Sequence, residues 1–254
     1  MKEFKLNGCS TRLRYHDLPG NDTPILFIHG LGCASSFDYP QVVSTGGLES
    51  HRRILVDMVG SGFSDKPEDF DYSIANHANC LAQLINHLGL SKVIIYGHSM
   101  GGAVSISLAK QISDRVQTLI LSEANLDSGG GFFSQRIASF SESDFLHSAY
   151  TKIIQKSIES GNTEWAAGLS NSLPLAIYKN ALSLIAGEQP SWRETFYALP
   201  VSKTYIFGSN SLPDPDAEIL ANHKIQIEIV PGAGHSMAWE NPEGLALAIK
   251  KSIV

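Results

Sequence analysis

The sequence predicts an α/β fold whose mostly parallel central sheet is interrupted by a helical insertion. Continuous apolar runs such as residues 25–28 and 93–96 are typical of strands that are buried on both faces of a parallel sheet. Segments with helical spacing of apolar residues alternate with these runs, and this order implies right-handed crossovers. The alternation stops after Leu126 and resumes near residue 200, so one sheet is expected to carry an inserted segment.

The expected elements follow from the same patterns, taken along the chain. Ile74, Leu81, Leu84 and Leu88 recur at helical spacing before Gly89, a residue typical of a helix end. Between residues 127 and 199 no strand-like run occurs. We expect a core of residues 1–126 and 200–254, with residues 127–199 as a helical cap. The predicted strands are 4–6, 11–16, 25–28, 53–57, 93–96, 116–121, 203–208 and 225–230, and the predicted core helices are 73–88, 103–111 and 242–253.

The composition of the chain argues against several classes of function. The chain has 254 residues, 43% hydrophobic and 17% charged, which supports a sizeable core. A net charge of −6 without a run of like charges argues against a nucleic acid or an anionic membrane as partner. No stretch reaches the about 18 apolar residues that a membrane span needs, the first residues do not resemble a signal peptide, and the three cysteines lack metal-ligand spacing. We expect a cytoplasmic protein that uses no metal or cofactor and binds a small molecule, in an oligomeric state that the sequence leaves open.

Ser99 is the strongest candidate for a catalytic residue. It stands in a Gly97-x-Ser99-x-Gly101 turn between a buried strand and a helix rich in small residues. A nucleophile on such a sharp turn needs small neighbours two positions away, and the helix N-terminus behind it offers free amides to a developing oxyanion. The pattern therefore predicts a nucleophilic serine.

With its four short motifs, the chain resembles the α/β-hydrolase family over nearly its whole length. Residues 29–32 (HGLG), 57–64 (DMVGSGFS), 97–102 (GHSMGG) and 232–235 (GAGH) follow the order of that family's loops. The resemblance implies the α/β-hydrolase fold with a helical cap inserted after strand 6, and an esterase-like serine hydrolase. Serine at position 99 argues against the epoxide hydrolase and dehalogenase branches, which carry aspartate there.

The base and the oxyanion donors are expected near Ser99. A serine hydroxyl needs a base to take its proton, and His235 is favoured because it follows the last strand in a glycine-rich loop. Backbone amides are good oxyanion donors because they need no reorganisation as charge develops. The resemblance assigns this role to the amides of Leu31 and Met100.

The acidic residue that would orient His235 does not follow the family's usual pattern. Most members carry an aspartate shortly after strand 7, but here that position is Ser211. Some relatives place a glutamate at the end of strand 6 instead, and Glu123 stands there. A carboxylate at the end of a buried strand is costly unless it is paired, and a bond to His235 would pair it. We expect Glu123 to be the acid. The alternatives left open are Asp214, Asp216 and Asp127.

These residues predict a hydrolase that cleaves a carboxylic ester or thioester of a small-to-medium, largely apolar substrate. Carbon–carbon bond or lactone hydrolysis, and a hydrolase-like ligand sensor, are the alternatives. The insertion is expected to cover the site. Candidate pocket walls are Phe132, Phe133, Phe140, Trp165, Leu169, Leu173 and Tyr178 from the insertion, and Met237, Ala238 and Trp239 beside His235.

Overall fold

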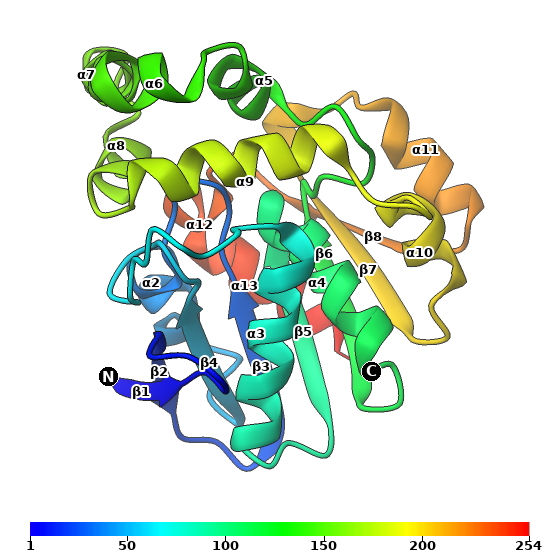
Figure 1. Ribbon diagram of the computed structural model, residues 1–254. Helices are drawn as coiled ribbons and strands as arrows, with labels where there is room; N and C mark the ends of the chain where they lie inside the picture. Colours follow the sequence, from blue (N-terminus) through cyan, green and yellow to red (C-terminus); the bar gives the residue numbers. More distant parts are fainter. Residues whose placement is uncertain (254) are drawn as a thin grey trace.

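An eight-stranded sheet forms the centre of the computed structural model, which describes residues 1–253 (Figure 1). Its strand order is β1-β2-β4-β3-β5-β6-β7-β8. The β1–β2 and β2–β4 pairs are antiparallel and the other pairs are parallel, which confirms the predicted fold class. The strands are β1 (Lys2–Lys5), β2 (Arg12–Leu18), β3 (Asp22–Ile28), β4 (His51–Asp57), β5 (Val93–His98), β6 (Val116–Ser122), β7 (Ser202–Gly208) and β8 (Gln226–Val230).

Both faces of the sheet are buried, as the continuous apolar runs predict. Leu26 and Ile28 of β3 belong to one hydrophobic core, and Ile25 and Phe27 to another on the opposite face. All four side chains are fully buried. Alternate residues of a strand point to opposite faces, so the strand must be apolar at every position.

Helices cover each face of the sheet. The first core includes residues of α3 (Ile74–His87) and α4 (Met100–Gln111), and the second includes residues of α2 (Pro40–Ser44) and α13 (Pro242–Ser252). The helix α3 starts where the Ser73 hydroxyl accepts the Asn76 amide, a typical N-cap. The remaining core helices are α1 (Ser35–Asp38), the 3₁₀ turn η2 (Ser209–Ser211), α11 (Pro215–Asn222) and α12 (Met237–Glu240).

The segment between β6 and β7 is helical, as predicted. Figure 1 shows α5 to α9 gathered beyond one end of the sheet. The interpretation of residues 127–199 as a cap domain distinct from the core stays a prediction. Its helices are α5 (Phe132–Ala138), α6 (Glu142–Asp144), the π-helical turn η1 (Phe145–Ala149), α7 (Tyr150–Glu159), α8 (Thr163–Ser170), α9 (Pro174–Ala186) and α10 (Trp192–Ala198).

A buried polar contact ties this segment to the core. Nε2 of His77, on α3, lies 2.9 Å from Oδ1 of Asn180, on α9. Burial lowers the pKa of His77 to about 4, so the ring is neutral at pH 7 and donates its Nε2–H to the amide oxygen. None of the helices within residues 1–253 is long and apolar enough to cross a membrane.

Candidate active site

Ser99 lies on a sharp turn between β5 and α4. Its backbone has φ 53° and ψ −121°, a region that costs free energy for a residue with a side chain. The turn is also crowded: a Cβ on Gly97 would stand 2.1 Å from Oγ of Ser105, and a Cβ on Gly101 would stand 2.4 Å from the Ile28 carbonyl oxygen. Only glycine fits these positions, as the motif predicts.

His235 reaches Ser99 from the loop after β8. Its Nε2 lies 3.2 Å from Oγ of Ser99. The loop is held in place because the Gly234 amide donates to the Glu240 carboxylate at 2.8 Å, and the Asn210 amide donates to the Ala233 carbonyl at 2.8 Å. The predicted nucleophile and base are therefore within hydrogen-bonding distance.

Glu123 lies on the other side of the His235 ring. Its Oε2 is 2.8 Å from Nδ1 of His235, and its Oε1 accepts the Gly208 amide at 3.0 Å. Burial acts to raise the pKa of Glu123, but hydrogen bonds from His235, from the Ser211 side chain and from the Gly208 amide outweigh it and lower this pKa to about 2. The carboxylate is thus ionised at neutral pH, and Ser211, which stands at the family's usual acid position, contacts it.

The three alternative acids have other partners. Asp214 is the N-cap of α11 and accepts the Asp216 amide at 2.8 Å. Asp216 and Asp127 both pair with Arg193, at 2.9 and 2.6 Å. The structure therefore brings Glu123 to His235, and it places these three aspartates in local capping and ion-pair contacts.

The loop that carries Leu31 lies against Ser99. A Cβ on Gly30 would stand 3.3 Å from the Cβ of Ser99, so the next amide, that of Leu31, is close to the nucleophile. Met100 begins α4 directly after Ser99. Among the described residues, neither amide donates a hydrogen bond to another protein group, which leaves both free for a ligand oxygen.

Two side chains support this loop. The indole Nε1–H of Trp165, on α8, donates to the Leu31 carbonyl at 2.8 Å. Below the loop, His29 is fully buried; its Nδ1 contacts the Gly30 carbonyl at 2.8 Å, and its Nε2 accepts the Met58 amide at 3.0 Å. Sequence reasoning placed Trp165 in the pocket wall but did not foresee its bond to the loop.

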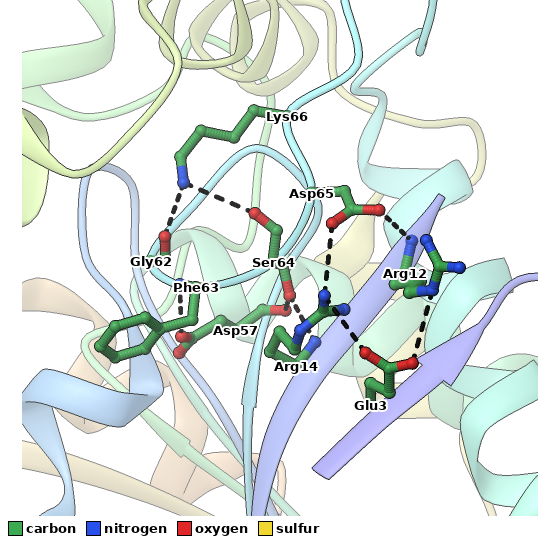
Figure 2. Close-up of polar contacts among 9 residues, drawn as sticks. All are labelled: Glu3, Arg12, Arg14, Asp57, Gly62, Phe63, Ser64, Asp65 and Lys66. Carbon is green, nitrogen blue, oxygen red and sulfur yellow. Dashed lines mark hydrogen bonds and ion pairs between the residues drawn. The ribbon is translucent and has the colours of Figure 1, made fainter. Parts of the chain in front are cut away.

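The motif that begins at the last residue of β4 builds a hydrogen-bonded turn (Figure 2). Asp57 accepts the amides of Ser36 and Phe63 at 2.9 and 3.0 Å. The Lys66 ammonium donates to the Gly62 carbonyl at 2.6 Å, and Figure 2 shows it spanning the turn. The Ser64 hydroxyl donates to the Asp57 carbonyl at 2.5 Å. These bonds give the motif a structural role, since its side chains hold the turn together and tie it to the neighbouring segments at Ser36 and Arg14.

A cavity of about 450 Å³ opens onto Ser99 and His235. Of the candidate walls, Phe140, Leu169, Leu173 and Tyr178 are wrong, because they are not among the residues that line the cavity. Leu169 and Tyr178 belong to the hydrophobic core, and Phe140 and Leu173 pack against it. Helical spacing marks an apolar face, but it does not say whether that face meets a cavity or another helix. The walls that line it as expected are Phe132, Phe133, Trp165, Met237, Ala238 and Trp239.

Sequence reasoning missed several polar residues of this cavity. Asp38 is the most notable, and the signal that could have found it is an acidic residue between the aromatic Phe37 and Tyr39, nine positions after His29. Its burial raises the pKa of the carboxyl to about 6. The other missed polar residues include Cys33, Asn125 and Glu164.

Comparisons with known proteins agree with this geometry at the level of the fold. Haloalkane dehalogenase 2 of Mycobacterium tuberculosis is 33% identical over 110 residues, which cover 43% of this chain and 37% of that protein. The 2-hydroxymuconate semialdehyde hydrolase of Pseudomonas putida is 34% identical over 120 residues, which cover 47% and 42%. The chain thus spans about two fifths of the length of these curated relatives.

A solved structure matches the chain from end to end. The thermophilic esterase from Thermogutta terrifontis superposes with a TM-score of 0.81 at 22% identity, and the match covers 100% of each chain. At this identity the likeness concerns the fold alone. The sequence profile of the alpha/beta hydrolase fold matches residues 23–242. With this match over most of its length, the chain belongs to the alpha/beta hydrolase fold family.

Proposed function

We propose that the protein is a serine hydrolase that cleaves a carboxylic ester or thioester of a small-to-medium, largely apolar substrate. The observation that carries this proposal is the continuous chain of contacts from Oγ of Ser99 through the imidazole of His235 to the carboxylate of Glu123, at 3.2 and 2.8 Å. Nucleophile, base and orienting acid in this arrangement are the parts that acyl transfer requires.

In the proposed reaction, Oγ of Ser99 attacks the substrate carbonyl carbon while Nε2 of His235 takes the hydroxyl proton. The electron pair of the carbonyl moves onto its oxygen, which the amides of Leu31 and Met100 bind. Collapse of this intermediate breaks the bond to the alcohol or thiol, which leaves with the proton from His235. Water then attacks the acyl-enzyme with His235 as base, and the carboxylic acid is released.

Glu123 holds His235 in this cycle. A carboxylate on Nδ1 keeps the proton on that nitrogen, so that Nε2 is free to accept a proton from Ser99. The low pKa of Glu123 keeps it charged while the imidazolium forms. The walls of the cavity are aromatic and aliphatic around these polar groups, which favours an apolar acyl or alcohol part.

A second candidate reaction has one specific observation in its favour. The Pseudomonas putida relative acts, by its name, on 2-hydroxymuconate semialdehyde, so hydrolysis of a carbon–carbon bond is the alternative within the same fold. Lactone opening uses the same groups and belongs to the same test. The alternative that is not an enzyme is a ligand sensor that retains the hydrolase geometry.

The test combines turnover and covalent labelling. Purified protein should hydrolyse para-nitrophenyl acetate and butyrate with a burst of nitrophenol, and a fluorophosphonate probe should label it once per chain. Ser99→Ala should abolish both the burst and the labelling while the folded state persists by circular dichroism. Protein that neither turns over these esters nor takes the probe would contradict the proposal and favour the sensor. Labelling without ester turnover, with cleavage of a semialdehyde or lactone substrate, would favour the alternative reactions.

A further inference from the structure

Asp38 places a carboxyl in the wall of the cavity that contains Ser99 and His235. It is the last residue of α1, the short helix that follows the loop with Gly30 and Leu31. The proposed acyl-enzyme cycle makes no use of this side chain. A carboxyl group is expensive to hold in a cavity with apolar walls, so its presence there calls for a reason.

The partners of Asp38 within the protein are all neutral. Its Oδ1 accepts the indole N–H of Trp239 at 3.1 Å, and the thiol of Cys33 forms a second side-chain hydrogen bond with it. Among residues 1–253, no lysine, arginine or histidine forms an ion pair with Asp38. The negative charge of the carboxylate is therefore not compensated by the protein itself.

The surroundings of Asp38 favour one kind of ligand group. A carboxylate has about four acceptor positions, and Trp239 and Cys33 use two of them. The rings of Trp239, Trp165 and Phe133 line the same cavity, and aromatic faces attract cations. Among residues 1–253, the wall of the cavity includes no lysine or arginine that would repel a cation.

Given the hydrolase function proposed above, we propose that Asp38 binds a positively charged ammonium group of the substrate and so selects esters that carry one. The substrate is then apolar over most of its surface and cationic at one end. The ammonium belongs either to the acyl part or to the alcohol part, and the two cases share the same chemistry at Asp38.

The experiment compares each cationic ester with a neutral ester of the same shape. Butyrylcholine and 3,3-dimethylbutyl butyrate differ only by nitrogen for carbon in the alcohol part. The para-nitrophenyl esters of trimethylammonio-butanoate and 5,5-dimethylhexanoate form the matching pair for the acyl part. The quantity measured is the ratio of kcat/KM for the cationic ester to that for its neutral partner, and the pair with the higher ratio identifies the end that Asp38 binds.

Asp38→Asn removes the charge but keeps an oxygen that can accept the Trp239 indole. We expect it to lower the ratio about tenfold or more in one pair, a factor that corresponds to about 1.4 kcal/mol. Glu164→Gln is the matched control for a carboxyl of the same cavity and should change the ratio less than about twofold. A ratio that stays within twofold in Asp38→Asn for both pairs, or that falls only in Glu164→Gln, overturns the proposal. Stoichiometric labelling by a fluorophosphonate shows that each variant retains its site.

The wild-type protein offers a second measurement that needs no variant. Quaternary ammonium groups do not titrate, so the ratio should fall as the pH decreases through about 6, where the Asp38 carboxyl takes up a proton. The groups around Asp38 that also titrate are Cys33, Tyr39, Tyr96 and Asp57. Burial raises the pKa of the thiol and of both tyrosines, so they stay neutral in this range. An effect of Asp57, Glu164 or His235 would persist in Asp38→Asn, whereas the proposed effect disappears in that variant.

The design separates the two proposals. Absence of hydrolysis of the neutral esters by the wild-type protein would contradict the hydrolase function. If the neutral esters are hydrolysed but the kcat/KM ratio changes neither in Asp38→Asn nor with pH, only the proposed role of Asp38 is contradicted.

Discussion

Oε2 of Glu123 and Nδ1 of His235 are 2.8 Å apart although 112 positions separate the two residues in the chain. Glu123 is placed by the end of β6 and by its bond to the Gly208 amide of β7, and His235 is placed by the loop after β8. Adjacent parallel strands end at the same edge of the sheet, so residues that follow β6, β7 and β8 meet there.

Replacement of Glu123 by glutamine should lower kcat for para-nitrophenyl butyrate by about 10³–10⁴. Glutamine has the same shape but no charge, and its amide can hold the imidazole in the wrong tautomer. Asp214→Asn is the control, because Asp214 only caps α11; it should retain kcat within about twofold. Steady-state kinetics on both variants measures these changes in kcat. A large loss in Asp214→Asn with little loss in Glu123→Gln would show that Asp214 is the acid.

A second prediction concerns Ser211, whose side chain bonds to Glu123. Glu123→Ala should be nearly inactive, and adding Ser211→Asp should restore kcat by about 10-fold or more, since a carboxylate then stands close to Nδ1 of His235. The matched control is Glu123→Ala with Ser209→Asp, which adds the same charge two positions away, where the Ser209 hydroxyl contacts the Gly232 amide instead. Equal recovery in both double variants would mean that charge alone, and not its position, matters.

The bond from Trp165 to the Leu31 carbonyl predicts that α8 helps to hold the loop whose Leu31 amide is proposed to bind the substrate oxygen. Trp165→Phe keeps an aromatic ring, although a smaller one, and loses the N–H, so kcat should fall about 2- to 10-fold, the loss expected for one hydrogen bond. Trp192 is the control, because its indole donates to the Ser107 hydroxyl at 3.1 Å in a buried position outside the cavity wall. Trp192→Phe should lower the thermal midpoint and leave kcat unchanged. If both variants lose kcat alike, the effect reflects general destabilisation of the helices.

The strands and the sharp turn at Ser99 were predictable because each depends on a local pattern, whereas the meeting of Ser99 with His235, 136 positions away, was expected from the family resemblance of the loops that carry them. An apolar run of four or five residues predicts a buried strand, and a glycine-rich turn after it predicts a strained serine. Glu123 was predictable because a carboxyl at the end of a buried strand needs a partner. These sequence patterns can be recognised without knowing which elements lie next to them in the fold.

Contacts made by the helices after β6 were not predictable in the same way. Trp165 and Leu31 are 134 positions apart, and no spacing in either segment encodes their meeting. Tyr178 and Leu169 have the same apolar helical pattern as residues that line the cavity, but they pack into the core. The role proposed for Asp38 depends on the absence of an ion-pair partner for it among residues 1–253, which is a property of the folded cavity rather than of any one segment.

The raised pKa of Asp38 predicts how its removal changes stability. Burial raises this pKa from 3.8 to about 6, so between these values the folded state holds a proton that the unfolded state has released. Taken alone, Asp38 therefore costs no free energy of unfolding below about pH 4, its cost grows as the pH rises from about 4 to about 6, and the cost stays at its full value above that. The cost at pH 7.5 is about 1–3 kcal/mol.

Asp38→Asn removes this cost, because the amide does not ionise. Its thermal midpoint at pH 7.5 should exceed that of the wild-type protein by about 2–4 °C for each kcal/mol regained, and the difference should shrink to near zero at pH 3.5, where the carboxyl is protonated in both states. Glu164→Gln, at an exposed position of the same cavity, should shift neither midpoint. A variant that is less stable than the wild type at pH 7.5 would show that the Trp239 and Cys33 contacts stabilise the carboxylate more than its burial costs. Greater stability together with loss of ammonium selectivity is the combination expected of a charge that the protein keeps for its ligand.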